Sequence, residues 1–138
     1  RTIGLTKSAE ILVSAPPTSS LEVPILNEGE IYLGAIICGE SAHRHHTILL
    51  PGDVENKTWK QAMKWAADQG GDLPNRVEQA LLFATLKSEF QEAAYWSNSQ
   101  HASDSGYAWC QDFGDGNQND YGTYDKLRAR AVRRLIIQ

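Results

Sequence analysis

Cysteine and long apolar runs are both scarce in this sequence. Only Cys38 and Cys110 occur among 138 residues, and separation along a chain says nothing about whether two Cα atoms come close enough to bridge, so we expect free thiols. No apolar stretch reaches the length of a membrane span, and no signal peptide is visible. The chain begins at Arg1 instead of Met, which is typical of a processed protein or a fragment. We expect no insertion into a membrane.

Charge of one sign is also limited. The net charge of -4 argues against a nucleic-acid partner, although four arginines cluster near the C-terminus, at Arg128, Arg130, Arg133 and Arg134. They alternate with apolar residues, which favours structural arginines on a sheet face; a phosphate-binding patch is the alternative. Hydrophobic residues at 41% and charged residues at 22% are typical of a globular protein. A chain of this length can form one domain without metal or disulfides.

The N-terminal region differs from the rest of the chain. Two short β-prone runs, Ile11–Val13 and Leu21–Leu26, lie on either side of Pro16 and Pro17, which lack the N–H donors of a strand ladder. A turn signature then follows at residues 27–30. We expect residues 1–28 to form a β-rich extension or oligomerisation segment and residues 29–138 to form the main domain.

Two further runs predict a pair of strands. The segment Ile31–Cys38 is almost continuously apolar, which suits a strand covered on both faces. The segment His45–Leu50 predicts its antiparallel neighbour. The loop between them carries His43, and we expect exposed loop histidines there, with His46 inside the sheet, instead of a metal site, because His43 and His45 would share a face while His46 points away.

The middle of the chain predicts two helices. Thr58 and Gln61 have the spacing of a capping box, and the helix that follows ends at Gly70-Gly71. Its core-facing stripe is expected at Trp59, Ala62, Met63 and Ala66, with Trp65 on the flank. A second helix should begin at Asn75, with Glu78 completing its cap, and run to about Lys87. Its buried face is expected at Val77, Ala80, Leu81 and Ala84.

Residues 95–134 hold the expected binding surface. An alternating run ends at Asp115-Gly116-Asn117, a polar segment follows, and a second alternating run closes the chain, which predicts a strand, an exposed loop and a closing strand. Tyrosine offers large contacts at low entropy cost, and Asn, Ser and Asp add adaptable hydrogen bonds. The candidate ligand-binding residues are Asn98, Gln100, His101, Ser103, Asp104, Tyr107, Asn117, Asn119, Asp120, Tyr121 and Tyr124. An ordinary polar loop is the alternative.

Several motifs in order resemble a known domain. The chain is similar, over roughly residues 29–136, to a domain of unknown function found in phage and prophage proteins and at the C-terminus of a bacterial collagen-like adhesin. The motifs that carry the resemblance are Leu50-Pro51-Gly52, Thr58-Trp59, Gly70-Gly71-Asp72-Leu73-Pro74-Asn75-Arg76, Tyr95-Trp96-Ser97, Tyr107-Ala108-Trp109, Phe113-Gly114-Asp115-Gly116 and Arg128-Ala129-Arg130-Ala131-Val132-Arg133-Arg134.

The resemblance implies an α+β, C-type-lectin-like fold of the formylglycine-generating-enzyme subtype, with two helices against a twisted, mostly antiparallel sheet. Domains of this subtype also serve as variable proteins of diversity-generating retroelements. Calcium-dependent lectins of this fold carry a Glu-Pro-Asn or Gln-Pro-Asp triplet and a Trp-Asn-Asp triplet, but this chain has Leu73-Pro74-Asn75 and Trp96-Ser97-Asn98. The oxygen-bearing residues 112–120 fit no twelve-residue calcium loop either. We expect no metal and no cofactor.

Catalysis is not indicated. The enzymes that name the subtype use two reactive cysteines, and neither Cys38 nor Cys110 lies in a matching motif. His101 and Asp104 are sequence neighbours without a catalytic arrangement. The sequence therefore favours a non-enzymatic recognition domain, such as that of a tail fibre. We expect it to be made in the cytoplasm, displayed on a virion or bacterial surface, and bound to a protein or glycan receptor. A structural assembly module and a cysteine-dependent enzyme are the alternatives.

Overall fold

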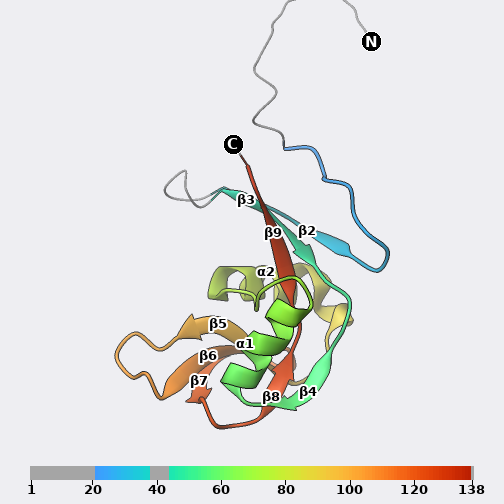
Figure 1. Ribbon diagram of the computed structural model, residues 1–138. Coiled ribbons are helices and arrows are strands. Elements are labelled where there is room, and N and C mark those ends of the chain that lie inside the picture. The colour runs from blue at the N-terminus through green and yellow to red at the C-terminus, as the bar shows by residue number, and fades with distance from the viewer. Residues whose placement is uncertain (1–20, 38–43, 138) are drawn as a thin grey trace, which may run out of the picture.

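The structure is a computed structural model that describes residues 21–37 and 44–137 and shows an α+β fold, as expected (Figure 1). In chain order the elements are β2 (Ile31–Ile36), β3 (His45–Leu49), β4 (Val54–Lys57), α1 (Trp59–Asp68), α2 (Arg76–Leu86), the short 3-10 helix η3 (Lys87–Glu89), β5 (Ala94–Gln100), β6 (Tyr107–Asp112), β7 (Gln118–Gly122), β8 (Leu127–Ala129) and β9 (Val132–Ile136).

The described strands form two sheets, whereas the sequence predicts a single sheet. One has three antiparallel strands in the order β2-β3-β9, and the other has five in the order β4-β8-β5-β6-β7, of which only β5 and β8 run parallel. The chain passes between the sheets twice, after β3 and between β8 and β9. The Leu50 N–H donates to the Ala131 carbonyl at 2.9 Å and joins these two crossings. Helix α2 lies between the sheets (Figure 1).

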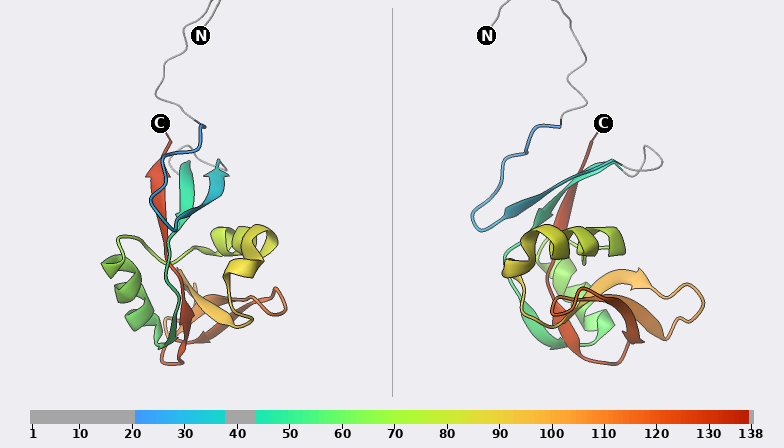
Figure 2. Two further views of the ribbon diagram at one scale, coloured as in Figure 1. Left: turned by 90° about the vertical axis from the view of Figure 1, so that its right-hand side faces the viewer. Right: turned by 180° about the vertical axis from the view of Figure 1, so that it is seen from behind.

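The N-terminal strand predictions are only partly correct. Leu21–Leu26 forms no strand, whereas the turn at residues 27–30 is confirmed by the Glu30 N–H, which donates to the Asn27 carbonyl at 3.1 Å. Residues 21–28 run beside the three-stranded sheet, where the Arg133 guanidinium reaches the Ile25 carbonyl (Figure 2). Ile11–Val13 lies outside the described residues.

Strand β3, not β2, is the buried strand of the three-stranded sheet. The two pair antiparallel as predicted, but β2 is an edge strand and is only partly buried, whereas every residue of β3 is buried. His46 therefore lies in the sheet, as expected, and His45 lies there too instead of in an exposed loop. The Tyr32 hydroxyl lies 2.8 Å from His46 Nδ1, and the Thr47 hydroxyl lies 3.0 Å from His45 Nδ1. His43 and Cys38 lie outside the described residues.

Helix α1 agrees with its prediction. Thr58 and Gln61 form the capping box, Ala62 and Ala66 are fully buried, and Gly70 adopts the left-handed conformation with φ of 85°. Trp59, Met63 and Trp65 pack against the same core, which is centred on Trp96, Ala108 and Cys110 of the five-stranded sheet. The helix therefore covers one face of that sheet.

Helix α2 has the predicted N-terminal cap, but the prediction of its buried face is wrong. Asn75 and Glu78 form the capping box, yet Val77, Ala80, Leu81 and Ala84 are all exposed. The buried residues are Glu78, Gln79 and Leu82. Leu82 joins a second core with Phe90, Tyr95 and Phe113.

Polar partners on both sheets explain this orientation of α2. Gln79 Nε2 donates to the Tyr95 and Trp96 carbonyls of β5 at 3.0 and 3.1 Å. Glu78 faces the other sheet, where its carboxylate accepts from Arg134 Nη2 at 2.7 Å and from the Thr47 hydroxyl at 3.1 Å. Turning the apolar residues inward would leave these buried groups without partners, at a cost of about 1–3 kcal/mol each.

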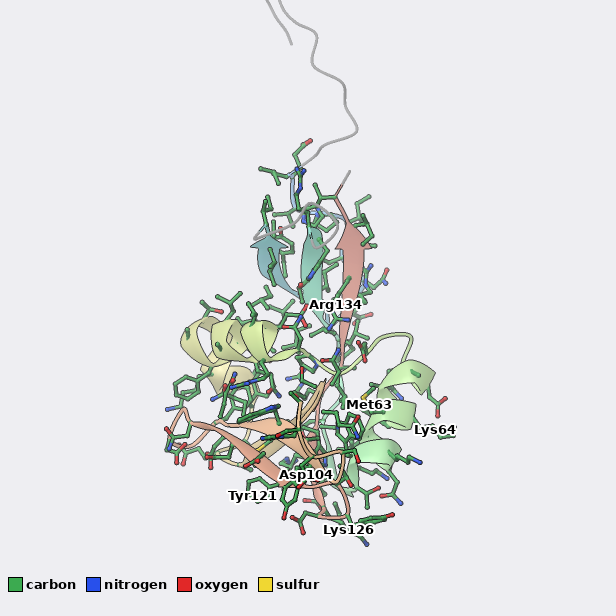
Figure 3. All side chains as sticks on the ribbon, turned by 90° about the vertical axis from the view of Figure 1, so that its left-hand side faces the viewer. Met63, Lys64, Asp104, Tyr121, Lys126 and Arg134 are labelled. Carbon is green, nitrogen blue, oxygen red and sulfur yellow. The ribbon has the colours of Figure 1, made fainter. Side chains whose placement is uncertain are left out.

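The C-terminal arginines are structural, as favoured from the sequence. Arg128 pairs with Asp53, Arg133 with Glu30, and Arg134 with Asp72 and Glu78. Arg130 is buried and donates to the Leu50 and Glu89 carbonyls at 2.8 and 2.6 Å. Arg134 lies at the junction between the three-stranded sheet and the rest of the fold (Figure 3).

Candidate functional site

Most of the candidate residues are on the surface. Side chains of nine of the eleven are exposed, and two are partly buried. The exposed ones are Gln100, Ser103, Asp104, Tyr107, Asn117, Asn119, Asp120, Tyr121 and Tyr124; the partly buried ones are Asn98 and His101. Asp104 and Tyr121 lie at the end of the molecule opposite the three-stranded sheet (Figure 3). The structure thus presents this segment to solvent, but it does not place all of it on one surface.

Two of the candidates line a cleft at this end. We call it the loop cleft; its volume is about 550 Å³, and it is lined by Thr58, Trp59, Lys60, Gln100, Ser105, Gly106, Thr123 and Tyr124. It lies between the start of α1, the β5–β6 loop and the β7–β8 loop. Its volume falls within the range of roughly 300–1,000 Å³ that is usual for ligand sites.

Backbone hydrogen bonds hold the walls of the loop cleft together. The Thr123 N–H donates to the Gly106 carbonyl at 2.8 Å and joins the two loops. The Trp59 N–H, one of the donors left free at a helix start, donates to the Thr123 carbonyl at 3.1 Å and joins α1 to both. The cleft is therefore braced by the main chain, independently of the side chains that face the solvent.

The side chains of the loop cleft combine aromatic surface with one cation. Tyr124 is 91% exposed at the rim. Trp59 is partly buried, and its indole N–H donates to the Ser97 carbonyl at 2.8 Å. Gln100 Nε2 donates to the Ser105 carbonyl at 2.7 Å, and Lys60 is exposed. An aromatic wall with adaptable polar groups can contact a protein or a sugar ring.

Three further candidates, Asn119, Asp120 and Tyr121, divide between the two faces of β7. The segment predicted as an exposed loop is in fact an edge strand over residues 118–122, which pairs with β6. Directly paired residues share a face, so Asn119 and Tyr121 lie on the α1 side with Cys110 and Ala108. Asp120 pairs with Trp109 and lies on the α2 side. A partner that touches all of these residues must therefore wrap around the β7 edge.

Asn98 and Asn117 are set apart from the loop cleft. Asn98 Nδ2 donates to Asp72 Oδ2 at 2.9 Å, so its side chain belongs to the polar contacts around Arg134. Asn117 lies in the turn between β6 and β7, at the other end of the hairpin, where its N–H donates to Asp115 Oδ1 at 2.8 Å. Both residues have structural partners that the sequence did not reveal.

His101 pairs with a residue other than the one considered from the sequence. Its Nε2 lies 3.5 Å from Asp120 Oδ2, and its ring stacks on Trp109 with centroids 5.5 Å apart. The Ser103 N–H and hydroxyl both lie near His101 Nδ1, at 3.2 and 3.3 Å. The order serine, histidine, aspartate is that of a hydrolase triad, but both side-chain links exceed good hydrogen-bond length and the serine is exposed. The Ser103–His101 contact is that of a local turn, and the His101–Asp120 contact joins this turn to β7.

Cys110 is a free thiol in the core. It is fully buried beneath α1, and burial raises its pKa to about 11 from the ordinary 9.0. A nucleophilic cysteine needs the opposite, an accessible thiolate with a lowered pKa. Cys110 is thus a core residue, and Cys38 lies outside the described residues.

Within residues 21–37 and 44–137, no group of three or more His, Cys, Asp or Glu side chains could hold a metal ion, and neither helix has the length and apolar character of a membrane span. Asp112 and Asp115, considered as calcium ligands, accept backbone N–H groups of the β6–β7 turn.

Sequence reasoning missed the part of the loop cleft that α1 contributes. The sequence pattern places Trp59 and Lys60 in a helix, and both residues lie more than 60 positions before Tyr124. No local pattern links the two segments, because only the tertiary structure places the α1 start beside the β7–β8 loop. No protein family matches this chain, and no curated protein matches it.

Proposed function

We propose that this chain is a non-enzymatic recognition domain that binds a cell-surface protein or glycan through the loop cleft and the adjoining face of β7. The observation that carries the proposal is Tyr124, a large aromatic side chain left 91% exposed on a cleft whose walls are braced by backbone hydrogen bonds. Exposed aromatics on a rigid base are the side chains that dominate many interfaces, because they lose little entropy on binding.

We also propose the fold subtype and the origin that the sequence resemblance implies. We assign the domain to the C-type-lectin-like fold of the formylglycine-generating-enzyme subtype and to a phage or prophage protein such as a tail fibre. The exposed positions Gln100, Asn119, Tyr121 and Tyr124 are suited to a variable protein of a diversity-generating retroelement. Substitutions at these exposed positions would leave the two cores untouched.

Substitution of the exposed tyrosines tests this function. We expect Tyr124→Ala and Tyr121→Ala to reduce binding at least tenfold, because each removes a large contact surface while leaving the core intact. Binding of the labelled chain to a panel of bacterial cells and to a glycan array measures the effect. Ile25→Ala is the matched control, since Ile25 is 92% exposed and interacts with Arg133 of the three-stranded sheet only through its backbone carbonyl. Equal binding by all three variants and the parent would disprove the proposal.

One observation favours a second candidate, an assembly module. Six large apolar side chains are exposed in residues 21–37 and on β9, namely Leu21, Val23, Ile25, Ile37, Leu135 and Ile136. Exposed apolar surface of this kind marks contacts between subunits when it is contiguous. Under this alternative, Ile25→Ser with Ile136→Ser would change the sedimentation coefficient, and Tyr124→Ala would change neither assembly nor binding.

A further inference from the structure

An apolar groove lies on the α2 side of the five-stranded sheet, apart from the loop cleft. Its volume is about 710 Å³, and it is lined by Arg76, Val77, Ala80, Leu81, Phe83, Gln111, Gly116 and Gln118. Val77 is 53% exposed and Leu81 is 38% exposed, because α2 turns Glu78 and Gln79 inward instead. The helix therefore leaves apolar side chains uncovered beside the β6–β7 hairpin.

Close packing of Gly116 on Phe83 fixes the position of the β6–β7 turn at the groove. A Cβ atom added to Gly116 would lie 2.8 Å from the Phe83 ring, so the turn can pack on Phe83 only with glycine at this position. Gly116 also has φ of 86°, which a side chain disfavours. Phe83 packs in turn against Phe113, with ring centroids 6.0 Å apart.

One guanidinium is held at the groove without an acidic partner. Arg76 Nε donates to Gln118 Oε1 at 2.9 Å, and its Cζ lies 3.7 Å from the centre of the Trp109 ring. Gln118 Nε2 returns a bond to the Arg76 carbonyl at 2.7 Å. Arg128, Arg133 and Arg134 each pair with a carboxylate, whereas no ion pair joins Arg76 to any described residue. A fixed, unpaired guanidinium is suited to binding a carboxylate.

Strand β7 leaves backbone hydrogen-bonding groups free beside the groove. It is an edge strand, with β6 as its only neighbour among the described strands. The bonds from Asp112 N–H to the Asn117 carbonyl and from Thr123 N–H to the Gly106 carbonyl show that odd-numbered residues of this segment face β6. In an antiparallel pair the intervening residues face the other way, so the N–H and C=O groups of Gln118 and Asp120 point outward.

We propose that this groove binds an extended segment of a partner protein that carries apolar side chains and one acidic side chain. The segment adds to the β7 edge as a sixth strand, using the free backbone groups of Gln118 and Asp120. Alternate side chains of the segment then enter the groove, where the apolar ones contact Leu81 and the acidic one pairs with Arg76. An extended peptide is the occupant because it alone supplies strand hydrogen bonds, apolar contacts and a carboxylate together.

The inference concerns the α2 side and the free edge of β7, whereas the proposed recognition function uses the loop cleft and the α1-side face of β7. The groove is lined by α2 and the β6–β7 turn, and it shares no lining residue with the loop cleft. Receptor binding through Tyr124 and peptide binding through Arg76 can therefore succeed or fail separately.

A peptide titration of the full chain tests the inference. The probe is a capped peptide of alternating threonine and apolar residues, with glutamate at the central inward-facing position. Its first control has glutamine in place of glutamate, and its second has N-methylated backbone amides. We expect shifts of the Trp109 indole resonance and slower hydrogen exchange of the Gln118 and Asp120 amides. We also expect about tenfold weaker binding of the glutamine peptide and no binding of the methylated one.

Variants separate the contacts. Arg76→Gln should bind the glutamate and glutamine peptides equally, and Leu81→Ser should weaken both, with circular dichroism confirming that each variant is folded. Arg44→Gln, immediately before β3, is the matched control for loss of an arginine and should behave like the parent. Equal affinity of the parent for the two peptides, or exchange at Gln118 and Asp120 unchanged by the probe, would overturn the inference. Shifts confined to the loop cleft, or protection of these amides by self-association without peptide, would also overturn it.

Discussion

Helices α1 and α2 start with the same kind of capping box, but α1 buries only alanines whereas α2 buries two polar side chains beside one leucine. In α1 the inward residues are Ala62 and Ala66, as its apolar periodicity predicts. In α2 two of the three buried residues are Glu78 and Gln79, and the apolar residues at helical spacing face the solvent. Periodicity therefore identifies both helices but gives the correct orientation for only one.

The difference follows from what each helix packs against. Helix α1 covers one face of a single sheet and meets the apolar side chains of Trp96 and Ala108. Helix α2 lies between two sheets and meets the Tyr95 and Trp96 carbonyls on one side and Arg134 on the other. Buried polar groups need partners, so the requirements of the neighbours outweigh the apolar stripe. The same orientation exposes the groove that we propose binds a peptide.

Removal of Arg134 should cause the largest loss in the free energy of unfolding. It should also disturb the orientation of α2 that buries Glu78 and Gln79. Arg134→Ala leaves the Glu78 carboxylate buried without its cation, and we expect a loss of about 3–5 kcal/mol in the free energy of unfolding. Urea denaturation measures it. The control is Lys64→Ala, which removes the exposed Lys64–Asp68 pair of α1 and should cost under about 0.5 kcal/mol. Similar losses in the two variants would mean that the buried pair does not orient α2.

Two adjacent leucines of α2 differ in burial. Leu82 is fully buried and Leu81 is not. We expect Leu82→Ala to cost about 2–5 kcal/mol, because it leaves a cavity in the core, and Leu81→Ala to stay within about 0.5 kcal/mol. Thermal and urea unfolding give both values. The predicted order would be reversed if α2 buried the apolar face that its sequence suggests.

The two capping boxes should contribute equally, since they form the same contacts. Thr58→Ala in α1 and Asn75→Ala in α2 should each cost about 1 kcal/mol, because each removes the acceptor for a backbone N–H of the first turn. Ser88→Ala, an exposed serine without a capping hydrogen bond, is the control. A much larger loss for Asn75→Ala would show that the Asn75 cap also holds Glu78 in its ion pair.

The smallest effect concerns Arg133, the neighbour of Arg134 on β9. The hydrogen bond from Arg133 holds the pKa of Glu30 at about 2, below its ordinary 4.5. Because the folded pKa is the lower one, this stabilisation is complete above pH 4.5 and declines as the pH falls towards 2. We expect the Tm difference between the parent and Glu30→Gln to shrink over that interval. A difference that stays constant over this interval would contradict the assignment.

Local patterns in the sequence predicted the elements that depend on short-range chemistry. Both capping boxes, the Gly70 stop and the pairing of β2 with β3 are confirmed, because a cap or a turn is decided within a few residues. The sequence predicts that β2 is covered on both faces, but β2 is a partly buried edge strand and β3 is the buried central strand. An apolar run does not show how many neighbours a strand has. The strand β7 was missed because an edge strand exposed on both faces is as polar as a loop.

The sequence alone determined that the chain forms an α+β fold with two capped helices and a polar, tyrosine-bearing segment near its C-terminus. Only the tertiary structure decided that the strands divide into two sheets, that α2 turns its polar side inward, and that α1 supplies one wall of the loop cleft. The physical reason is distance along the chain: Glu78 meets Arg134 and Trp59 meets Thr123 only after folding. Contacts of that kind leave no periodic signature in the sequence.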